Sequence, residues 1–303
     1  MTDDARRTAA ALGRLFIVST PIGNMGDFSF RAVEILRAVA LVLAEDTRHS
    51  RPLLDRYDIH TTTTSYHEHN EAKMTPKLVQ RLLAGEDMAL ISDAGTPLLS
   101  DPGQRLVRAA IAAGIQVVPI PGASALLAAL VASGMDAERF TFYGFLPRKG
   151  KERAAILDEI ASSRHTAVLY EAPNRVAASL RELADRTGGA ERPVVVAREV
   201  TKQFEELQRG TLGSLGAYYS NSPPRGEVVI LIAGASPAAA DETVLREEAR
   251  ALRARGLSVR DVAGELTKRG VARNVAYRIA RTADMAKGRA DMGHRTSDMG
   301  ADE

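Results

Sequence analysis

The 303-residue sequence contains no cysteine and no tryptophan, and aromatic residues make up only 5% of it. Without cysteine the chain has no disulfide, no thiolate zinc or iron–sulfur site and no thiol nucleophile, which suits a reducing cytoplasm. A large excess of one charge is also absent, since 40 Lys/Arg face 38 Asp/Glu for a formal net charge of +2. This balance argues against a protein that coats polyanions along its length and against a disordered acidic chain.

The sequence also lacks an uninterrupted apolar stretch of membrane-spanning length. A run of 27 residues without charge, Ala109–Met135, is long enough to cross a bilayer. However, Gly and Pro interrupt it at the spacing of an α/β unit, so we expect a buried helix, a strand, a turn and a new helix. The first 14 residues have acids before their basic pair and no apolar segment, so we expect no signal peptide and a cytoplasmic protein.

Short apolar runs alternate with helical patterns up to about residue 235, which predicts an α/β fold with a parallel sheet followed by a mixed sheet. Strands are predicted at Leu15–Ser19, Leu41–Ala44, Ile59–Thr64, Met88–Ser92, Gln116–Ile120, Phe140–Phe145, Ala167–Tyr170, Val194–Ala197, Glu205–Thr211 and Glu227–Ile232. Helices are predicted near Ser29–Val39, after Pro102, after Ser124, and near Lys151–Ser162, Asn174–Arg186 and Leu212–Ser220.

Gly134 and a charge cluster interrupt the pattern, which predicts two α/β domains over residues 14–132 and 133–235. Residues 249–283 hold nine Lys/Arg and two Asp/Glu, a net charge of +7, whereas the rest holds 31 and 36, a net charge of −5. We therefore predict a basic module resembling a helix-turn-helix over 241–286, with a helix capped by Ser258, a turn at Gly270-Val271 and a helix over Ala272–Ala283. The polar residues 287–303 are expected to be a disordered tail.

Three loops that follow predicted strands are rich in Gly and Pro: Thr20–Asp27, Asp93–Gly103 and Pro121–Ser124. In open α/β sheets, ligands bind at the carboxyl ends of the strands. Neither a dinucleotide fingerprint nor a phosphate-binding P-loop is present, which disfavours NAD binding and ATP hydrolysis. The loops instead favour a neutral or zwitterionic ligand, with Asp93 accepting from an amine or hydroxyl and Ser124 donating to a carboxylate. The alternative is that Asp93 only shapes its turn and Ser124 only caps a helix.

Polar clusters accompany these loops. They are Glu45-Asp-Thr-Arg48, His67-Glu-His-Asn-Glu71, Arg198-Glu-Val-Thr-Lys202 and the basic loop Pro147-Arg-Lys-Gly-Lys151. No third ligand accompanies the two histidines at a suggestive spacing, so we favour a solvated pair and expect no metal. Lys202 is a base only if its pKa is depressed, which the acids nearby oppose. The basic loop either holds phosphates or is a solvated turn.

Nine motifs in order closely resemble those of the bacterial 16S ribosomal RNA 2′-O-ribose cytidine methyltransferases, a family of the tetrapyrrole-methylase superfamily. The motifs are Val18-Ser-Thr-Pro-Ile-Gly-Asn24, Ala44-Glu-Asp-Thr-Arg48, Ser65-Tyr-His-Glu-His-Asn70, Ser92-Asp-Ala-Gly-Thr-Pro97, Ser100-Asp-Pro-Gly103, Pro119-Ile-Pro-Gly-Ala-Ser-Ala125, Tyr143-Gly-Phe-Leu-Pro147, Tyr170-Glu-Ala-Pro-Asn-Arg175 and Arg198-Glu-Val-Thr-Lys202. The resemblance covers roughly residues 14–235.

The resemblance implies a two-domain α/β methyltransferase, typically a homodimer, that binds S-adenosylmethionine between its domains. Its expected substrate is the ribose 2′-hydroxyl of a decoding-centre cytidine in the 16S rRNA of the small ribosomal subunit. Matching motifs place the cofactor at Pro21, Asp93, Ala94, Gly95, Thr96, Pro97, Ser124, Ala125, Leu146, Ala172 and Pro173.

A ribose hydroxyl is a poor nucleophile until a base accepts its proton, and four side chains are candidates for this base: Glu45, Asp46, His67 and Glu199. The cations that we expect to hold RNA phosphates are Arg48, Arg148, Lys149, Lys151 and Lys202. Few aromatic residues favour recognition of backbone and shape over base stacking. Two alternatives stay open: a precorrin-type tetrapyrrole C-methyltransferase, and a nucleic-acid-binding regulator that senses a ligand.

Overall fold

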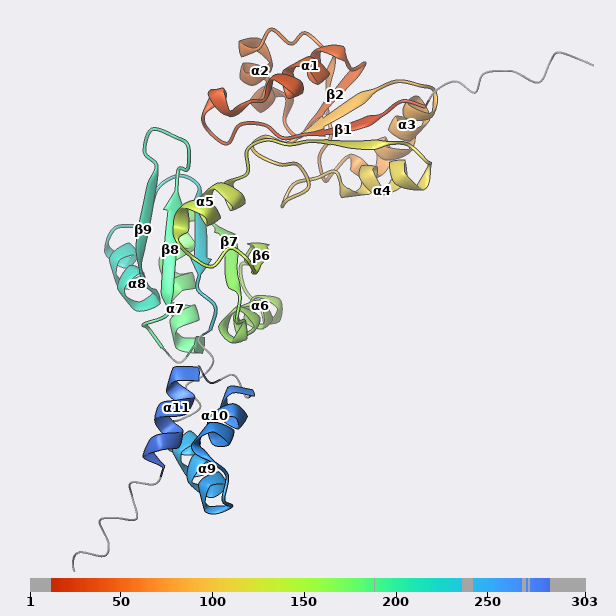
Figure 1. Cartoon of the computed structure of the whole chain (residues 1–303). Helices are drawn as coiled ribbons and strands as arrows, with labels where there is room; N and C mark the ends of the chain where they lie inside the picture. Colours follow the sequence, from red (N-terminus) through yellow and green to blue (C-terminus); the bar gives the residue numbers. More distant parts are fainter. Residues whose placement is uncertain (1–11, 188, 236–241, 269–270, 272, 284–303) are drawn as a thin grey trace, which may run out of the picture. The chain divides into compact units, whose positions relative to one another are not determined.

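The computed structural model describes residues 12–187, 189–235, 242–268, 271 and 273–283 (Figure 1). The chain forms two compact units, residues 1–234 and 235–303, which we describe separately. The expected tail at 287–303 and Gly270 of the expected turn lie outside the described residues. None of the described helices has the length and apolar composition that crossing a membrane requires.

A parallel five-stranded sheet forms the first part of the larger unit, in the order β3-β2-β4-β1-β5. Its three inner strands are fully buried because helices cover both faces, as is usual for parallel sheets, whereas the two edge strands are only partly buried. The strands are β1 (Leu15–Val18), β2 (Leu41–Ala44), β3 (Thr63–Ser65), β4 (Met88–Ile91) and β5 (Val117–Ile120). The parallel sheet predicted from the sequence is confirmed.

Two pairs of helices cover this sheet. On one face pack α1 (Phe30–Ala38) and α2 (Thr47–Arg56), whose leucines meet alternate residues of β1, β2 and β4. On the other face pack α3 (Glu71–Leu83) and α4 (Gln104–Ala112), which cover the intervening residues. The period-two alternation of a strand thus supplies both cores of this layer.

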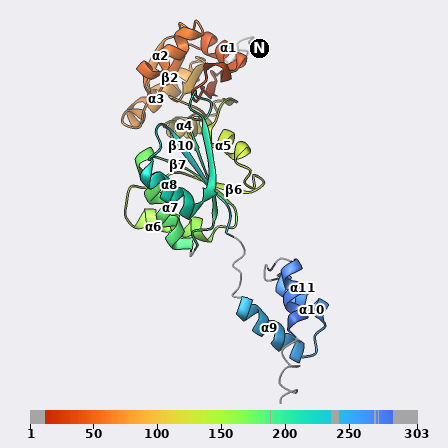
Figure 2. The ribbon, with the colours of Figure 1, turned by 90° about the vertical axis from the view of Figure 1, so that its left-hand side faces the viewer.

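The second sheet is mixed, in the order β6-β7-β10-β8-β9, with only the β6–β7 pair parallel. Its strands are β6 (Phe140–Phe145), β7 (Thr166–Glu171), β8 (Pro193–Arg198), β9 (Glu206–Thr211) and β10 (Val228–Ile232). Three helices, α6 (Lys151–Ser162), α7 (Val176–Thr187) and α8 (Leu212–Asn221), pack on one face. The apolar helix α5 (Ala125–Ser133) packs on the other face, as Figure 2 shows.

Some predicted elements differ from the observed ones. The third strand was expected over Ile59–Thr64, but β3 begins at Thr63, because Ile59 instead packs its side chain into the core under α1 and α2. The helix expected over Asn174–Arg186 begins with a short 3-10 turn, η2 (Pro173–Arg175), before α7. A 3-10 turn η1 (Met25–Asp27) precedes α1. The domain boundary expected near residue 132 assigns α5 to the domain of the first sheet. The buried leucines of α5 nevertheless pack against the second sheet.

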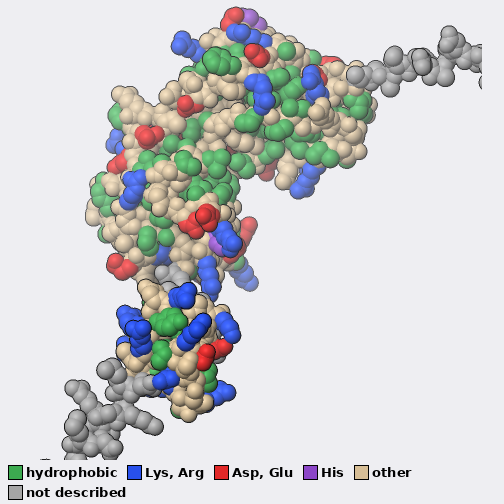
Figure 3. All heavy atoms as spheres, viewed as in Figure 1, with side chains coloured by type: hydrophobic (Ala, Val, Ile, Leu, Met, Phe, Trp, Pro, Cys, Tyr) green, Lys and Arg blue, Asp and Glu red, His purple; other side chains and the backbone are tan. Residues whose placement is uncertain are grey.

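The smaller unit consists, in its described part, of α9 (Glu242–Ala254), α10 (Val259–Lys268) and α11 (Arg273–Thr282). These helices enclose a core of their own that includes Leu245, Val262, Leu266 and Ile279. Ser258 caps α10 as expected, since its Oγ accepts from the N–H of Asp261 at 3.2 Å. Figure 3 shows Lys and Arg side chains spread over the visible face of this unit.

Candidate active site

The three Gly- and Pro-rich loops meet at the carboxyl ends of β1, β4 and β5. Thr20 and Gly95 exchange backbone hydrogen bonds of 2.8 and 3.1 Å. The hydroxyl of Thr96 accepts from Ser19 Oγ at 3.2 Å and donates to the carbonyl of Ala123 at 3.2 Å. A Cβ on Gly122 would lie 2.9 Å from that of Ser19, so this close approach requires glycine. These contacts bring the three loops together at one edge of the parallel sheet.

A cavity of about 390 Å³ lies beside these loops, within the larger unit. Its lining comes from both sheets, because the exit of β7 and the start of β10 complete the wall opposite the loops. The residues that line it are Ile22, Glu45, Asp93, Ala94, Gly95, Thr96, Leu99, Ser100, Asp101, Ser124, Ala125, Phe145, Tyr170, Glu171, Ala172, Pro173, Gly226, Glu227, Val228 and Val229. We call it the acidic cavity, since five of these residues are Asp or Glu and none is Lys, Arg or His.

Eight of the eleven residues expected at the cofactor line the acidic cavity: Asp93, Ala94, Gly95, Thr96, Ser124, Ala125, Ala172 and Pro173. The other three lie elsewhere. Pro21 lines a neighbouring cavity of about 290 Å³ that also touches Asp93. Leu146 lines a third cavity next to Ala172, and Pro97 is not among the residues that line any of these cavities.

Three carboxylates of the acidic cavity, those of Glu45, Asp93 and Asp101, lie close enough to affect one another. Burial raises the pKa of Glu45 above its ordinary value, and the nearby charges of Asp101 and Asp93 raise it further. Burial also raises the pKa of Asp101. Asp93 Oδ1 accepts from the N–H of Asp46 at 3.0 Å, which ties the loop after β4 to the start of α2. A group of partly buried carboxylates favours a ligand that carries positive charge.

The four candidate bases lie in different surroundings. Only Glu45 lines the acidic cavity. Asp46, its neighbour in sequence, caps α2 and pairs with Arg48 at 2.7 Å. These hydrogen bonds with Arg48 hold the pKa of Asp46 well below its usual range, which makes this carboxylate a weak base. Glu45 and Asp46 therefore differ although they are adjacent: Glu45 lines the acidic cavity, whereas Asp46 caps the start of α2.

His67 and Glu199 lie outside the acidic cavity. His67 lines a cavity of about 890 Å³ that shares Glu45 and Asp101 with it. The Nδ1 atom of His67 is buried without a hydrogen-bond partner, and Nε2 lies 3.3 Å from the amide of Asn70. The residues after His67 form a turn, in which its ring lies 5.9 Å from that of His69. Among the described residues, no group of three side chains is placed to hold a metal ion.

Glu199 and Lys202 form an ion pair of 3.0 Å in the loop after β8. The pKa of Glu199 is lowered chiefly because the N–H of Glu227 donates to its carboxylate. Burial lowers the pKa of Lys202, but hydrogen bonds and charge from Glu199 and Glu227 outweigh it, and the pKa is raised overall. Lys202 therefore stays protonated, in agreement with the objection to it as a base. Its side chain covers Gly23 in the loop after β1, which leaves no room for a Cβ there.

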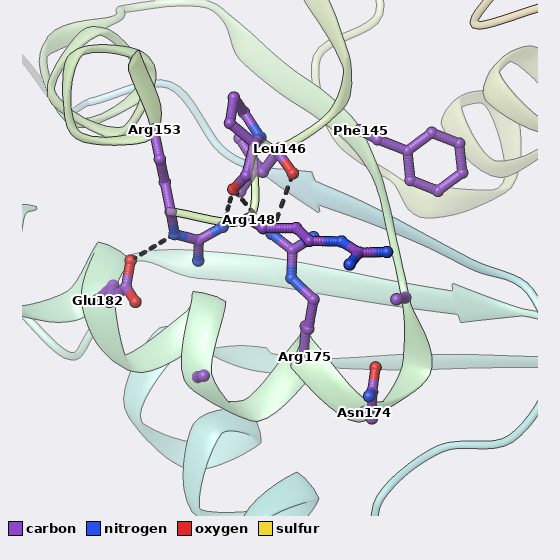
Figure 4. A pocket seen from close by; sticks show the side chains of 10 residues that line it. Phe145, Leu146, Arg148, Arg153, Asn174, Arg175 and Glu182 are labelled. Atoms are coloured by element: carbon purple, nitrogen blue, oxygen red, sulfur yellow. Dashed lines mark hydrogen bonds and ion pairs between the residues drawn. The ribbon is translucent and has the colours of Figure 1, made fainter. Parts of the chain in front are cut away.

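The basic loop borders the cavity that Leu146 lines, which has a volume of about 860 Å³ and shares Phe145 and Ala172 with the acidic cavity (Figure 4). We call it the basic cavity, since Arg148, Arg153 and Arg175 line it. Two arginines that line it are structural: Arg153 pairs with Glu182 at 2.9 Å, and Arg175 pairs with Glu171 at 3.3 Å. Their guanidinium groups also donate to the carbonyls of the loop. This network anchors the loop that presents Arg148.

Sequence reasoning gave no role to several residues of this region. Asp101 belongs to a recognised motif, Ser100-Asp-Pro-Gly103, and its raised pKa marks it only once the fold is known. Glu171 directly precedes the expected Ala172-Pro173 turn, but its pairing with two arginines depends on α6, which holds Arg153, and on η2, which holds Arg175. Residues Gly226–Val229 line the acidic cavity, but no motif in the sequence indicated that they belong to the site.

Comparison with known proteins agrees with this fold. A profile of the tetrapyrrole (corrin/porphyrin) methylases matches residues 14–216. The ribosomal RNA small subunit methyltransferase I of Synechocystis sp. is 48% identical over 250 residues, which cover 82% of this chain and 89% of that relative. The protein of the same name from Micromonospora olivasterospora is 42% identical over 290 residues, 92% of this chain and 90% of the relative, so the similarity extends into the smaller unit.

The fold also matches a solved structure of low sequence similarity. The crystal structure of uroporphyrin-III C-methyl transferase from Thermus thermophilus, complexed with S-adenyl homocysteine, has a TM-score of 0.54. The match covers 73% of this chain and 97% of the other at 17% identity, and it supports the fold alone. The α/β fold and the family expected from the nine motifs are confirmed. The chain belongs to the tetrapyrrole (corrin/porphyrin) methylase family.

Proposed function

We propose that the protein transfers the methyl group of S-adenosylmethionine to the ribose 2′-oxygen of a decoding-centre cytidine in 16S rRNA of the small ribosomal subunit. The observation that carries this proposal is the acidic cavity, built where three strand-exit loops meet. The relatives named ribosomal RNA small subunit methyltransferase I, which match most of the chain, supply the substrate class.

The residues of the acidic cavity fit this cofactor by charge and size. The cofactor has a sulfonium and an ammonium group against one carboxylate, so it is a net cation, and the cavity has acidic residues and no basic one. Its volume of about 390 Å³ falls within the range of about 300–1,000 Å³ usual for small-ligand sites. The Asp93–Thr96 loop, Ser124, Ala125 and the Ala172-Pro173 turn would hold the cofactor, and the carboxylate of Asp101 would attract its positive charge.

The chain's own residues then have two tasks, alignment and proton transfer. When bound, the cofactor supplies a methyl group on a sulfonium, a leaving group that needs no covalent help from the protein. The loops must hold the acceptor oxygen in line with that methyl group at about 3 Å. We propose Glu45 as the base, because it lines the acidic cavity and burial raises its pKa, which makes its carboxylate a stronger proton acceptor. The 2′-hydroxyl proton passes to Glu45 as the oxygen gains the methyl group.

Cations outside the cavity would hold the RNA backbone. Among the candidates, Arg48 and Lys202 already pair with carboxylates, whereas the described contacts of Arg148, Lys149 and Lys151 include no hydrogen bond or ion pair. We therefore favour the basic loop, together with the basic face of the smaller unit, as the contact to phosphates. A substrate within the ribosome would place the protein in the cytoplasm.

The resemblance also implies a homodimer. Light scattering of the purified protein tests this, since a dimer has twice the 32.5 kDa mass of the chain. A measured mass of 32.5 kDa across micromolar concentrations would remove the dimer from the proposal.

A tetrapyrrole C-methyltransferase is the second candidate, because the family description names tetrapyrroles and the basic cavity would also attract carboxylates. The deciding experiment offers methyl-labelled cofactor with small ribosomal subunits that lack the modification, and separately with a tetrapyrrole. We expect label in the RNA and none in the tetrapyrrole. The reverse partition would support the second candidate, and failure to bind the cofactor in a titration would contradict both.

A further inference from the structure

One aromatic side chain at the edge of the acidic cavity stands out by its exposure. Phe145 ends β6, lines both the acidic cavity and the basic cavity, and is 58% exposed. Burial of an aromatic ring stabilises the folded state, so exposure at the junction of two cavities calls for a function.

An irregularity in β6 places the ring there. Phe142 pairs with Val168 in a regular parallel ladder, and this register would set Gly144 opposite Tyr170. A shift after Phe142 sets Phe145 opposite Tyr170 instead. Gly144 has a φ of +61°, and a Cβ on it would lie 3.0 Å from Ser100 Oγ, so the bulge depends on this glycine.

Tyr170 supports the ring from behind. The ring centroids of Phe145 and Tyr170 lie 5.4 Å apart, and Tyr170 is itself held by Phe142 at 4.9 Å. Phe145 packs on Tyr170 in a tilted arrangement, while much of its ring remains open to a ligand.

The charges around Phe145 indicate which ligand it faces. On the side of the basic cavity the neighbouring cation is Arg148, and Figure 4 shows its guanidinium on the side of the cavity where Phe145 lies, away from the Arg153–Glu182 pair. Arg148 is exposed and has no described partner, unlike Arg153 and Arg175. An unpaired guanidinium beside an exposed ring suits a nucleotide of RNA, which offers a phosphate and a base. S-adenosylmethionine has no phosphate.

We propose that Phe145 is the platform on which the base of the acceptor nucleotide stacks, while Arg148 binds a phosphate next to it. This inference rests on the proposed function, since the stacked base would place its ribose at the opening of the acidic cavity. There the 2′-hydroxyl can meet Glu45, which lines the same cavity. The ring reads no hydrogen-bonding pattern, so it positions the nucleotide and leaves base identity to other contacts.

The test compares Phe145→Ala, Phe145→Leu and Phe145→Tyr in the full-length protein. The matched control is Phe30→Ala, because Phe30 is 92% exposed and lines none of these cavities. The readouts are the KM for small subunits, kcat, and the cofactor Kd from calorimetry. Loss of stacking on one base predicts a KM increase of about tenfold for the Ala and Leu variants, with Tyr and the control within about twofold of wild type. The cofactor Kd should stay within about twofold throughout.

Three results would overturn the proposal. If the cofactor Kd weakens as much as the KM rises, the ring contacts the adenine of the cofactor instead. If Leu matches wild type, only apolar cover is needed and no stacking occurs. If all variants bind and react like wild type, the ring has no role in the reaction. A wild-type protein that leaves small subunits unmethylated would instead refute the proposed function, and that failure is visible before any variant is made.

Discussion

Replacing Glu45 by Gln tests the proton acceptor with little change of shape. Gln has the size and shape of Glu and keeps one side-chain oxygen as a hydrogen-bond acceptor. It removes the negative charge and thereby the ability to take a proton. A positioned general base contributes about 10²- to 10⁴-fold to a rate, so we expect kcat to fall at least about a hundredfold.

The pH dependence follows from the direction of the pKa shift. Burial and the charges of Asp101 and Asp93 raise the pKa of Glu45, so the reactive ionised form is lost on acidification at a higher pH than for an ordinary glutamate. Wild-type kcat should therefore be flat above this raised pKa and fall about tenfold per pH unit below it. The Gln variant should lack that acidic limb.

The same shift predicts a gain in stability for the variant. The folded state holds the Glu45 proton more tightly than the unfolded state, so the contribution of this group to stability is greatest at low pH and is lost as pH rises through the raised pKa. At neutral pH the ionised carboxylate is therefore destabilising, and Glu45→Gln should raise the midpoint of thermal unfolding. If the variant is less active but more stable than wild type, unfolding does not explain the loss of activity.

The assay is single-turnover transfer of labelled methyl to saturating small subunits from about pH 4.5, near the ordinary pKa of a glutamate, to about pH 8.5. Asp46→Asn serves as the matched control, because Asp46 is adjacent in sequence but caps α2 and pairs with Arg48. This control should keep kcat within about threefold, since Asn is as good a helix cap as Asp. A Gln variant with more than half of the wild-type kcat, or with the wild-type acidic limb, would refute Glu45 as the base.

Three further changes separate binding from stability. Asp101→Asn removes a carboxylate of the acidic cavity and should weaken the calorimetric cofactor affinity about tenfold or more; an unchanged affinity would place the cofactor's charge elsewhere. Deletion after Gly234 removes the smaller unit with its own core, and should weaken binding to the small ribosomal subunit about tenfold in low salt but leave the cofactor Kd unchanged. Unchanged binding to the ribosomal subunit would show that the basic residues of the smaller unit form only a solvated surface. Arg153→Met removes one of the two arginines that neutralise buried Glu171 and should lower the free energy of unfolding by about 3 kcal/mol in urea titrations. A decrease below about 1 kcal/mol would show that Arg175 alone is enough to neutralise Glu171.

Local patterns predicted much of the fold. The strand-exit loops could be found because Gly and Pro mark them, and the mixed second sheet followed from the extra strand predicted at Glu205–Thr211, which is observed as β9 over Glu206–Thr211. Helices α2 and α3 were missed because Pro52 and Pro76 lie inside them. Proline normally ends a helix, and here the buried leucines of each helix outweigh the lost hydrogen bond.

The site was predicted less completely, because its lining is assembled from distant segments. Asp93 and Ser124 could be named from their loops, but Asp101 and Glu171 acquire their surroundings only when the two sheets come together. Sequence alone treated Glu45 and Asp46 alike. Their separation into a cavity residue and a helix cap depends on where α2 begins, which local composition does not determine. The expectation that base stacking matters little came from composition, and the stacking proposed for Phe145 departs from it.

The proposed function places the methyl group on one atom, the ribose 2′-oxygen of a cytidine. Small subunits from a strain without the modification are incubated with the protein and labelled cofactor, the 16S rRNA is digested to nucleosides, and these are separated by mass. We expect one 2′-O-methylcytidine per subunit with wild-type protein, and a rate at least about a hundredfold lower with Glu45→Gln. Label on a base, on another nucleoside, or on no RNA at all would contradict it.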